Sequence, residues 1–289
     1  MLKLIATDLD GTLLNERGNV SEENAEAIRK ALSQGIQVIV ATGRSYDAAN
    51  QPLQEVGLTL PIISLNGAKT YSQDQTVLRD KPMQLSVCKR IQSICEKEDM
   101  YFEVFTNKGI YSISRDDFKQ VIIDIMITAH PNISREELHV AVDQRFQDEK
   151  VQFTNDFDHL FNDLDLSVYK ILAFSLSDEV LQRVRNQFEE DSNVKITSSG
   201  SINLEFNDPQ AQKGIALSLF AKSMSIDMKD VMALGDNYND LSMLTLAGRG
   251  VAMGNADEAI KKQCDFTTKV NNEHGVAHAI EEMLKEVNV

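Results

Sequence analysis

The chain has 289 residues, of which 42% are hydrophobic and 25% are charged. This composition is typical of a globular protein, and the length fits one large domain or two modest ones. Lys and Arg total 29 against 44 Asp and Glu, which gives a formal net charge of −15 at pH 7. Nucleic-acid binding requires a basic surface, and an anionic membrane surface repels an acidic protein, so we expect neither as a partner.

The sequence indicates neither a membrane-spanning nor a secreted protein. No stretch approaches the roughly 20 consecutive apolar residues of a transmembrane helix, and the apolar start of the chain soon meets Asp8, unlike a secretory signal. The three cysteines, Cys88, Cys95 and Cys264, form no CxxC pair that would suggest zinc or redox chemistry. The spacing of Cys88 and Cys95 predicts one face of a helix. We therefore expect buried, reduced thiols and a cytoplasmic protein.

The first third of the chain alternates short apolar runs with a helical pattern. We expect strands at 2–7, 36–41 and 61–65 and a helix at 21–33. Strands and helices alternating at this spacing predict βαβ units and a parallel sheet. Ligands of such sheets bind at the carboxyl ends of the strands, so the residues that follow each strand are candidates for function.

The pattern changes after about residue 80, where Lys81-Pro82 marks a break. The expected elements of this block are a helix around 85–95, paired strands at 101–106 and 110–114, helical patterns at 116–152, a strand at 169–176, a helix at 178–190, and strands at 194–197 and 202–206. Because the strands come in runs and do not alternate with helices, the block is typical of a separate α+β domain.

The alternating pattern then returns, with a helix at 213–223, a strand at 231–234, a helix at 240–247, a strand at 250–253 and an amphipathic helix at 275–287. The predicted fold class is α/β. Residues 1–82 and 208–289 form one parallel-sheet domain built from both ends of the chain, and residues 83–207 form an α+β domain inserted between them.

Acidic residues follow two of the predicted strands. Asp8 and Asp10 come directly after the first strand, and Gly235-Asp236 with Asp240 follows a later one. Acidic residues are also common in turns, and an N-cap role explains Asp240 by itself. A turn does not explain a second acidic cluster at a second strand end. Four carboxylates brought together raise one another's pKa values unless a cation lies among them, so the sequence favours a metal site, with Mg²⁺ as the hard cation that carboxylates suit.

Two further positions carry weaker signals. Thr42-Gly43 follows the second strand, where a hydroxyl and backbone N–H groups can hold a phosphate, although an ordinary turn has the same composition. Lys213 opens a helix after the middle block. A single lysine on an acidic protein is usually a solvated surface charge, so its position alone leaves both interpretations open.

Taken together, these segments resemble the motifs of the haloacid dehalogenase superfamily. Asp8-Leu9-Asp10-Gly11-Thr12 is similar to its first motif, Thr42 to its second, Lys213 to its third, and Gly235–Asp240 to its fourth. Residues 66–68, 250–256 and 272–277 also resemble the Cof-type subfamily. The resemblance implies a Rossmann-like catalytic core and an α+β cap domain, inserted between the second and third motifs, that determines substrate specificity.

The resemblance also implies roles for the acidic residues. Asp8 is expected to be the nucleophile that forms an aspartyl-phosphate and to bind Mg²⁺. Asp10 is expected to act as general acid and base, with its backbone carbonyl as a metal ligand. Asp236 completes the expected protein ligands of the metal. Asp240 is expected to orient Lys213 or a metal-bound water.

The remaining expected roles concern the phosphoryl group. Its oxygens are expected to be bound by the hydroxyl of Thr42, the backbone amides of Leu9 and Gly43, the amide of Asn239 and the ammonium of Lys213. Lysine, metal and amides would supply the positive charge that phosphoryl transfer needs. Within the superfamily, the second aspartate Asp10 favours cleavage of a phosphate ester or anhydride.

The substrate is expected to be a small phosphorylated metabolite, with sugar phosphates as the main class among Cof-type relatives. Arg44, Asn66 and Glu205 are possible substrate contacts near the mouth of the site. Arg44 is equally consistent with an exposed arginine or an interdomain salt bridge, and Glu205 with a strand-end residue. Two alternatives remain, a phosphomutase or phosphotransferase that uses the same intermediate, and a non-catalytic ligand-binding protein. We expect a monomer or a weak dimer.

Overall fold

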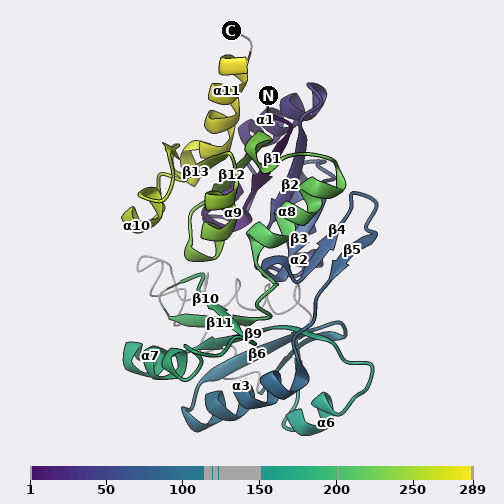
Figure 1. Cartoon of the computed structure of the whole chain (residues 1–289), viewed down its shortest axis with the longest axis vertical. Helices are drawn as coiled ribbons and strands as arrows, with labels where there is room; N and C mark the ends of the chain where they lie inside the picture. Colours follow the sequence, from purple (N-terminus) through teal and green to yellow (C-terminus); the bar gives the residue numbers. More distant parts are fainter. Residues whose placement is uncertain (1, 114–118, 120–122, 124–150, 201, 288–289) are drawn as a thin grey trace. The chain divides into compact units, whose positions relative to one another are not determined.

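The computed structural model describes residues 2–113, 119, 123, 151–200 and 202–287 (Figure 1). The chain forms two compact units. The core unit comprises Met1–Asp80 and Gln210–Val289, and the inserted unit comprises Lys81–Pro209. The boundaries predicted from the sequence, 82/83 and 207/208, each differ by two residues from those of the structure, 80/81 and 209/210. That the inserted unit serves as a specificity cap stays a prediction.

The core unit contains one sheet with the strand order β14-β13-β12-β1-β2-β3-β4-β5. Its strands from β14 to β3 pair in parallel, and β4 and β5 continue the sheet as antiparallel strands. The strand bounds are β1 (Leu4–Thr7), β2 (Gln37–Ala41), β3 (Ile62–Ser64), β4 (Lys69–Tyr71), β5 (Val77–Asp80), β12 (Val231–Gly235), β13 (Arg249–Ala252) and β14 (Phe266–Thr267). The α/β class predicted from the sequence is confirmed, and the antiparallel pair β4–β5 was not predicted.

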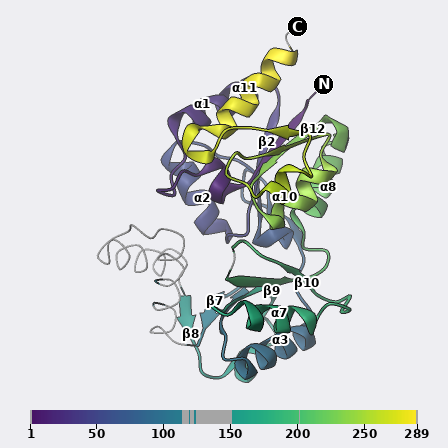
Figure 2. The same cartoon turned by 90° about the vertical axis from the view of Figure 1, so that its left-hand side faces the viewer.

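Helices cover both faces of this sheet, as a parallel sheet requires. The helix bounds are α1 (Glu22–Ser33), α2 (Tyr46–Glu55), α8 (Lys213–Ser223), α9 (Leu241–Leu246), α10 (Glu258–Lys261) and α11 (Gly275–Val287). Figure 2 shows α1, α2 and α11 on one side of the sheet and α8 on the other. The two layers have separate hydrophobic clusters, one containing Ile28, Leu53 and Ile280 and the other containing Leu217 and Met243.

The inserted unit has its own sheet and its own hydrophobic core. Among the described strands the order is β10-β11-β9-β6-β7-β8, and α3 and α7 pack against the sheet. The element bounds are α3 (Leu85–Lys97), β6 (Tyr101–Thr106), β7 (Gly109–Ser112), β8 (Val151–Phe153), α6 (Phe157–Phe161), β9 (Val168–Phe174), α7 (Asp178–Asn186), β10 (Lys195–Thr197) and β11 (Asn203–Asn207). Cys88 and Cys95 lie buried on one face of α3 as predicted, whereas Cys264 is only partly buried.

The helical prediction for 116–152 is wrong at its end, because β8 pairs in parallel with β7 from Val151 onward. Residues 114–118, 120–122 and 124–150 lie outside the described part of the chain. Helix α2 was also not predicted, and it contains Pro52, a residue that is unfavourable inside a helix. Within the described ranges, no helix combines the length and the hydropathy needed to cross a membrane.

Candidate active site

Three adjacent strand ends define the candidate site. Strand β1 lies between β2 and β12 and is parallel to both, so their carboxyl ends meet at one edge of the sheet. Asp8 follows β1, Thr42 follows β2, and Asp236 follows β12. The structure therefore brings together residues that are up to 228 positions apart in the sequence (236 minus 8).

A tight turn after β1 aims the first carboxylates. The amide of Asp8 donates to Leu234 O at 3.0 Å, and Leu14 N donates to Leu9 O at 2.9 Å across the turn. Gly11 has a φ of +72°, and a Cβ added there would lie 2.3 Å from Asp236 Oδ2. Glycine is thus required both for the left-handed backbone and for the close approach of Asp236.

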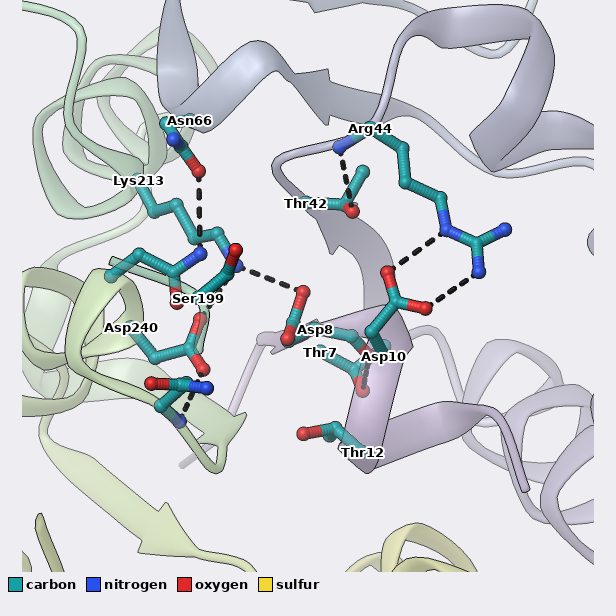
Figure 3. A network of polar contacts seen from close by, with 12 residues as sticks. Thr7, Asp8, Asp10, Thr12, Thr42, Arg44, Asn66, Ser199, Lys213 and Asp240 are labelled. Carbon is teal, nitrogen blue, oxygen red and sulfur yellow. Dashed lines mark hydrogen bonds and ion pairs between the residues drawn. The ribbon is translucent and has the colours of Figure 1, made fainter. Parts of the chain in front are cut away.

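Lys213 is a buried bridge and not a solvated surface charge. It is the first residue of α8, and its Nζ donates to Asp8 Oδ1 at 2.8 Å and to Asp240 Oδ1 at 2.6 Å (Figure 3). Burial by itself lowers the pKa of this ammonium, but the charges of Asp240 and Asp8 outweigh burial and raise the pKa. Lys213 therefore stays protonated between two carboxylates.

Asp240 uses both of its oxygens within the protein. Its Oδ1 accepts from Lys213, and its Oδ2 accepts from the backbone amides of Asp236 and Asn237 at 3.0 Å each. A carboxylate held in this way fixes both the lysine and the loop that follows β12. That Asp240 serves to orient Lys213 or a metal-bound water stays a prediction.

The acidic groups of the site fit a hard divalent cation. One carboxylate oxygen each from Asp8, Asp236 and Asp240 lie within 4.8 Å of one another. Three carboxylates and the one ammonium of Lys213 leave two negative charges, which a divalent cation would balance. Without such a cation, burial and then the Asp240 charge raise the pKa of Asp236 to about 7, and burial and neighbouring carboxylates raise the pKa of Asp8 despite Lys213. Asp240 already accepts three hydrogen bonds, from Lys213 and from two backbone amides, so Asp8 and Asp236 stay the predicted side-chain ligands of Mg²⁺.

The Asp10 carboxylate lies away from this cluster. Arg44 binds both of its oxygens, with Nε to Oδ2 at 2.9 Å and Nη2 to Oδ1 at 2.5 Å. Figure 3 shows the Asp8 carboxylate directed toward Lys213 and the Asp10 carboxylate directed toward Arg44. This ion pair lies within the core unit, so the pair is not an interdomain salt bridge.

The other predicted phosphate-binding residues lie at the same edge of the sheet. Thr42 is fully buried, and its Oγ1 accepts from the Arg44 amide at 3.2 Å. Asn239 Nδ2 donates to Asn66 Oδ1 at 3.4 Å, and Asn239 Oδ1 is buried without a hydrogen-bond partner among the described residues. Asn66 itself has a left-handed backbone, with a φ of 57°. Leu9 and Gly43 follow the ends of β1 and β2, where their backbone amides were expected.

Glu205 belongs to β11 of the inserted unit. It is buried, and it accepts hydrogen bonds from Thr197 Oγ1 at 3.2 Å and Ser199 Oγ at 3.1 Å. Lys170 Nζ lies 3.7 Å from Glu205 Oε1. These contacts all lie within the inserted unit, so a substrate contact by Glu205 stays a prediction.

Two side chains that the motifs did not assign bind Asp236. Thr12 Oγ1 donates to Asp236 Oδ1 at 3.0 Å, and Asn255 Nδ2 lies 3.5 Å from Asp236 Oδ2. Both residues belong to segments singled out in the sequence, the first motif and the run at 250–256. The sequence marks these segments, but only the fold shows which carboxylate they contact.

Known proteins are similar to this chain in sequence and in fold along nearly its whole length. The profile of the haloacid dehalogenase-like hydrolases matches residues 5–280. Phosphatase YwpJ of Bacillus subtilis (strain 168) is 36% identical over 98% of this chain and 100% of the relative. The 5-amino-6-(5-phospho-D-ribitylamino)uracil phosphatase YwtE of the same organism is 32% identical, over 98% of each chain. The solved structure of a haloacid dehalogenase-like hydrolase from B. subtilis has a TM-score of 0.90 at 36% identity, covering 98% of this chain and 100% of that one.

Proposed function

The chain belongs to the haloacid dehalogenase-like hydrolase family and is a phosphatase of that family, and we propose that it hydrolyses small phosphorylated metabolites with Mg²⁺ through a phosphoryl group on Asp8. The family predicted from the sequence motifs is confirmed. The observation that carries the proposal is the buried Lys213, which donates to Asp8 at the carboxyl edge of the parallel sheet. A nucleophilic carboxylate must be ionised, and Lys213 opposes the burial that raises the Asp8 pKa.

In the first step, an oxygen of Asp8 forms a bond to phosphorus while the bond from phosphorus to the leaving-group oxygen breaks. Asp10, in its protonated form, transfers its proton to that leaving oxygen, so an alcohol departs. The product on the protein is a mixed anhydride of the Asp8 carboxyl and phosphate. In the structure Arg44 binds both oxygens of Asp10, and we propose that Asp10 transfers the proton from this ion pair, which holds its carboxyl group in place.

In the second step, a water attacks the phosphorus of the anhydride and Asp10 accepts its proton. The bond between phosphorus and Asp8 breaks, which restores the carboxylate and releases inorganic phosphate. The groups assigned to the phosphoryl oxygens are the hydroxyl of Thr42, the ammonium of Lys213, the amide of Asn239, and the backbone amides of Leu9 and Gly43. Asp8, Asp236 and the backbone carbonyl of Asp10 would hold Mg²⁺, which would supply additional positive charge when bound.

We propose a sugar or polyol phosphate as the substrate class. YwtE is named for a substrate that carries its phosphate on a ribityl chain, and the Cof-type resemblance points to sugar phosphates. The catalytic residues contact the phosphoryl group, which is common to all such substrates. Choice among them is therefore assigned mainly to the inserted unit, where Glu205 is the candidate contact, and Asn66 is a second candidate contact in the core unit.

Phosphate release from a panel of compounds tests this function. The panel contains sugar phosphates, polyol phosphates, flavin mononucleotide and pyridoxal phosphate, each with Mg²⁺ and with EDTA. The proposal expects Mg²⁺-dependent release that Asp8→Asn abolishes while thermal unfolding stays cooperative. Phosphate release by Asp8→Asn at the wild-type rate would overturn the assignment of Asp8 as the nucleophile. Turnover that appears only after addition of a sugar bisphosphate would assign a phosphomutase instead.

A further inference from the structure

We propose that Thr12 and Asn255 are positioning residues that fix the two oxygens of Asp236 for a divalent cation. The proposal rests on the proposed function, because Asp236 is one of the expected metal ligands. Neither residue touches the phosphoryl group in the proposed mechanism. Their role is to determine where the Asp236 carboxylate points before any ligand arrives.

Thr12 binds the first oxygen of Asp236. It is fully buried in the turn after β1, and its Oγ1 donates to Asp236 Oδ1 at 3.0 Å. The two residues are 224 positions apart in the sequence. The hydrogen bond therefore joins the turn after β1 to the loop after β12 and fixes the direction of one Asp236 oxygen.

Asn255 approaches the second oxygen of Asp236 from another segment. Its Nδ2 donates to Gly11 O at 2.8 Å and lies 3.5 Å from Asp236 Oδ2. Its Oδ1 accepts from the Asn271 amide at 3.0 Å. The single side chain of Asn255 therefore joins the first turn, the loop after β12 and the C-terminal segment. The contacts of Asn255 thus indicate a structural role for the segment 250–256, which was singled out in the sequence.

Such support is needed because Asp236 lies among like charges. Asp240 and Asp10 both repel its carboxylate, and a carboxylate free to rotate would turn away from them. Residues that bind a metal ligand from outside the coordination sphere typically contribute 10- to 100-fold to metal affinity, because they orient the ligand before the metal binds. Thr12 has the shorter contact and is buried, so we assign it the larger share.

Direct Mg²⁺ binding, measured by calorimetry on the full chain without substrate, tests the proposal. We expect Thr12→Val to weaken Mg²⁺ binding by about 10- to 100-fold and Asn255→Ala by a smaller factor. Thr12→Ser retains the hydroxyl and should restore most of the affinity. Activity gives a second readout. The Mg²⁺ concentration for half-maximal rate should rise in the same order, while kcat at saturating Mg²⁺ stays within a few-fold of the wild type.

Asn272→Ala is the matched control. Asn272 Oδ1 accepts from the Glu16 amide at 2.9 Å, so it also links an N-terminal segment to the C-terminal segment, but it does not contact Asp236. This variant should bind Mg²⁺ like the wild type. Wild-type affinity in both Thr12→Val and Asn255→Ala, with the wild type itself binding Mg²⁺, would overturn the positioning role and leave the proposed function intact. Absence of Mg²⁺ binding in the wild type would instead contradict the proposed function.

Discussion

Arg44 and Asp10 form a two-point ion pair at the edge of the site, with both guanidinium-to-carboxylate contacts at 2.9 Å or less. Arg44 is itself held by the main chain, because its Nη1 donates to Ala48 O at 3.2 Å. Pro52 has no N–H to offer to that carbonyl four residues earlier in α2. The proline inside the helix therefore leaves an acceptor that Arg44 uses, and Arg44 in turn fixes the direction of the Asp10 carboxylate.

Substitution of Arg44 should lower kcat. Loss of the ion pair leaves Asp10 without a fixed direction, and misplacement of a proton-transfer group by about 1 Å can cost about 10²-fold in rate. We expect Arg44→Ala to reduce kcat by roughly this factor with little change in KM, and Arg44→Lys to recover part of it through one hydrogen bond. Steady-state kinetics on the best substrate of the panel measure both constants.

Arg249→Ala is the control for Arg44. Arg249 makes a similar two-point pair with Glu286, but it lies at the start of β13, the end of the strand opposite the site. This variant should keep both kcat and KM. A raised KM with unchanged kcat in Arg44→Ala would show instead that Arg44 binds the substrate, the other interpretation that the sequence left open.

Replacement of Lys213 by methionine should affect both catalysis and stability. Removal of a preorganised positive group costs about 10²–10³-fold in kcat. The buried Asp8 and Asp240 would also lose their common partner, and breaking a buried ion pair costs about 3–5 kcal/mol. Urea unfolding and kinetics measure the two effects. Lys222→Met, an exposed lysine on the same helix, should change neither, and wild-type kcat in Lys213→Met would contradict the assigned role.

Alanine substitutions at Gly11 and Gly18, which have similar backbone conformations, distinguish the effect of backbone strain from the effect of a collision with Asp236. Gly11 has a φ of +72° and Gly18 a φ of +77°, but only at Gly11 would a Cβ collide with Asp236, since Gly18 has no heavy atom within 4 Å. Alanine at either position costs about 1–2 kcal/mol of backbone strain. We expect only Gly11→Ala to lose Mg²⁺ binding and activity. Comparable losses in Gly18→Ala would show that the effect is not specific to Asp236.

The three cysteines should differ in their reactivity toward a thiol-modifying reagent. Burial raises the pKa values of Cys88 and Cys95 to about 12, so almost no thiolate forms on them at pH 8. Cys264 is only partly buried, although burial also raises its pKa. Iodoacetamide at pH 8, followed by peptide mapping, should label Cys264 alone in the native protein and all three after unfolding in urea. Native labelling of Cys88 or Cys95 would contradict the packing of α3.

The positions of Asp8, Thr42 and Asp236 could be predicted because their signals are local. Each follows an apolar run long enough for a buried strand, and parallel strands place their ends at one edge. The pairing of strands, by contrast, depends on residues that are distant in the sequence. Strand β8 has only three residues and owes its conformation to β7, and the hairpin of β4 and β5 is likewise defined by its sheet neighbours.

The side-chain partners within the site could not be predicted for the same reason. Arg44 follows the second strand closely in sequence, but its pairing with Asp10 depends on how β1 and β2 lie side by side. Thr12 and Asn255 meet at Asp236 only because three distant segments converge there. Motif spacing indicates which residues belong to the site, and only the fold assigns each hydrogen bond.

The central claim is that Asp8 carries the phosphoryl group during turnover. Acid quenching during turnover, followed by mass spectrometry of the peptides, measures this directly. The Asp10→Asn variant with p-nitrophenyl phosphate is suited to it, because this leaving group departs without a proton from Asp10, whereas loss of the general base slows hydrolysis of the intermediate. The account predicts a peptide heavier by one phosphoryl group, with the added mass on Asp8, and no such peptide in Asp8→Asn. A turning-over enzyme that carries the phosphoryl group on another residue, or that never carries one, would contradict it.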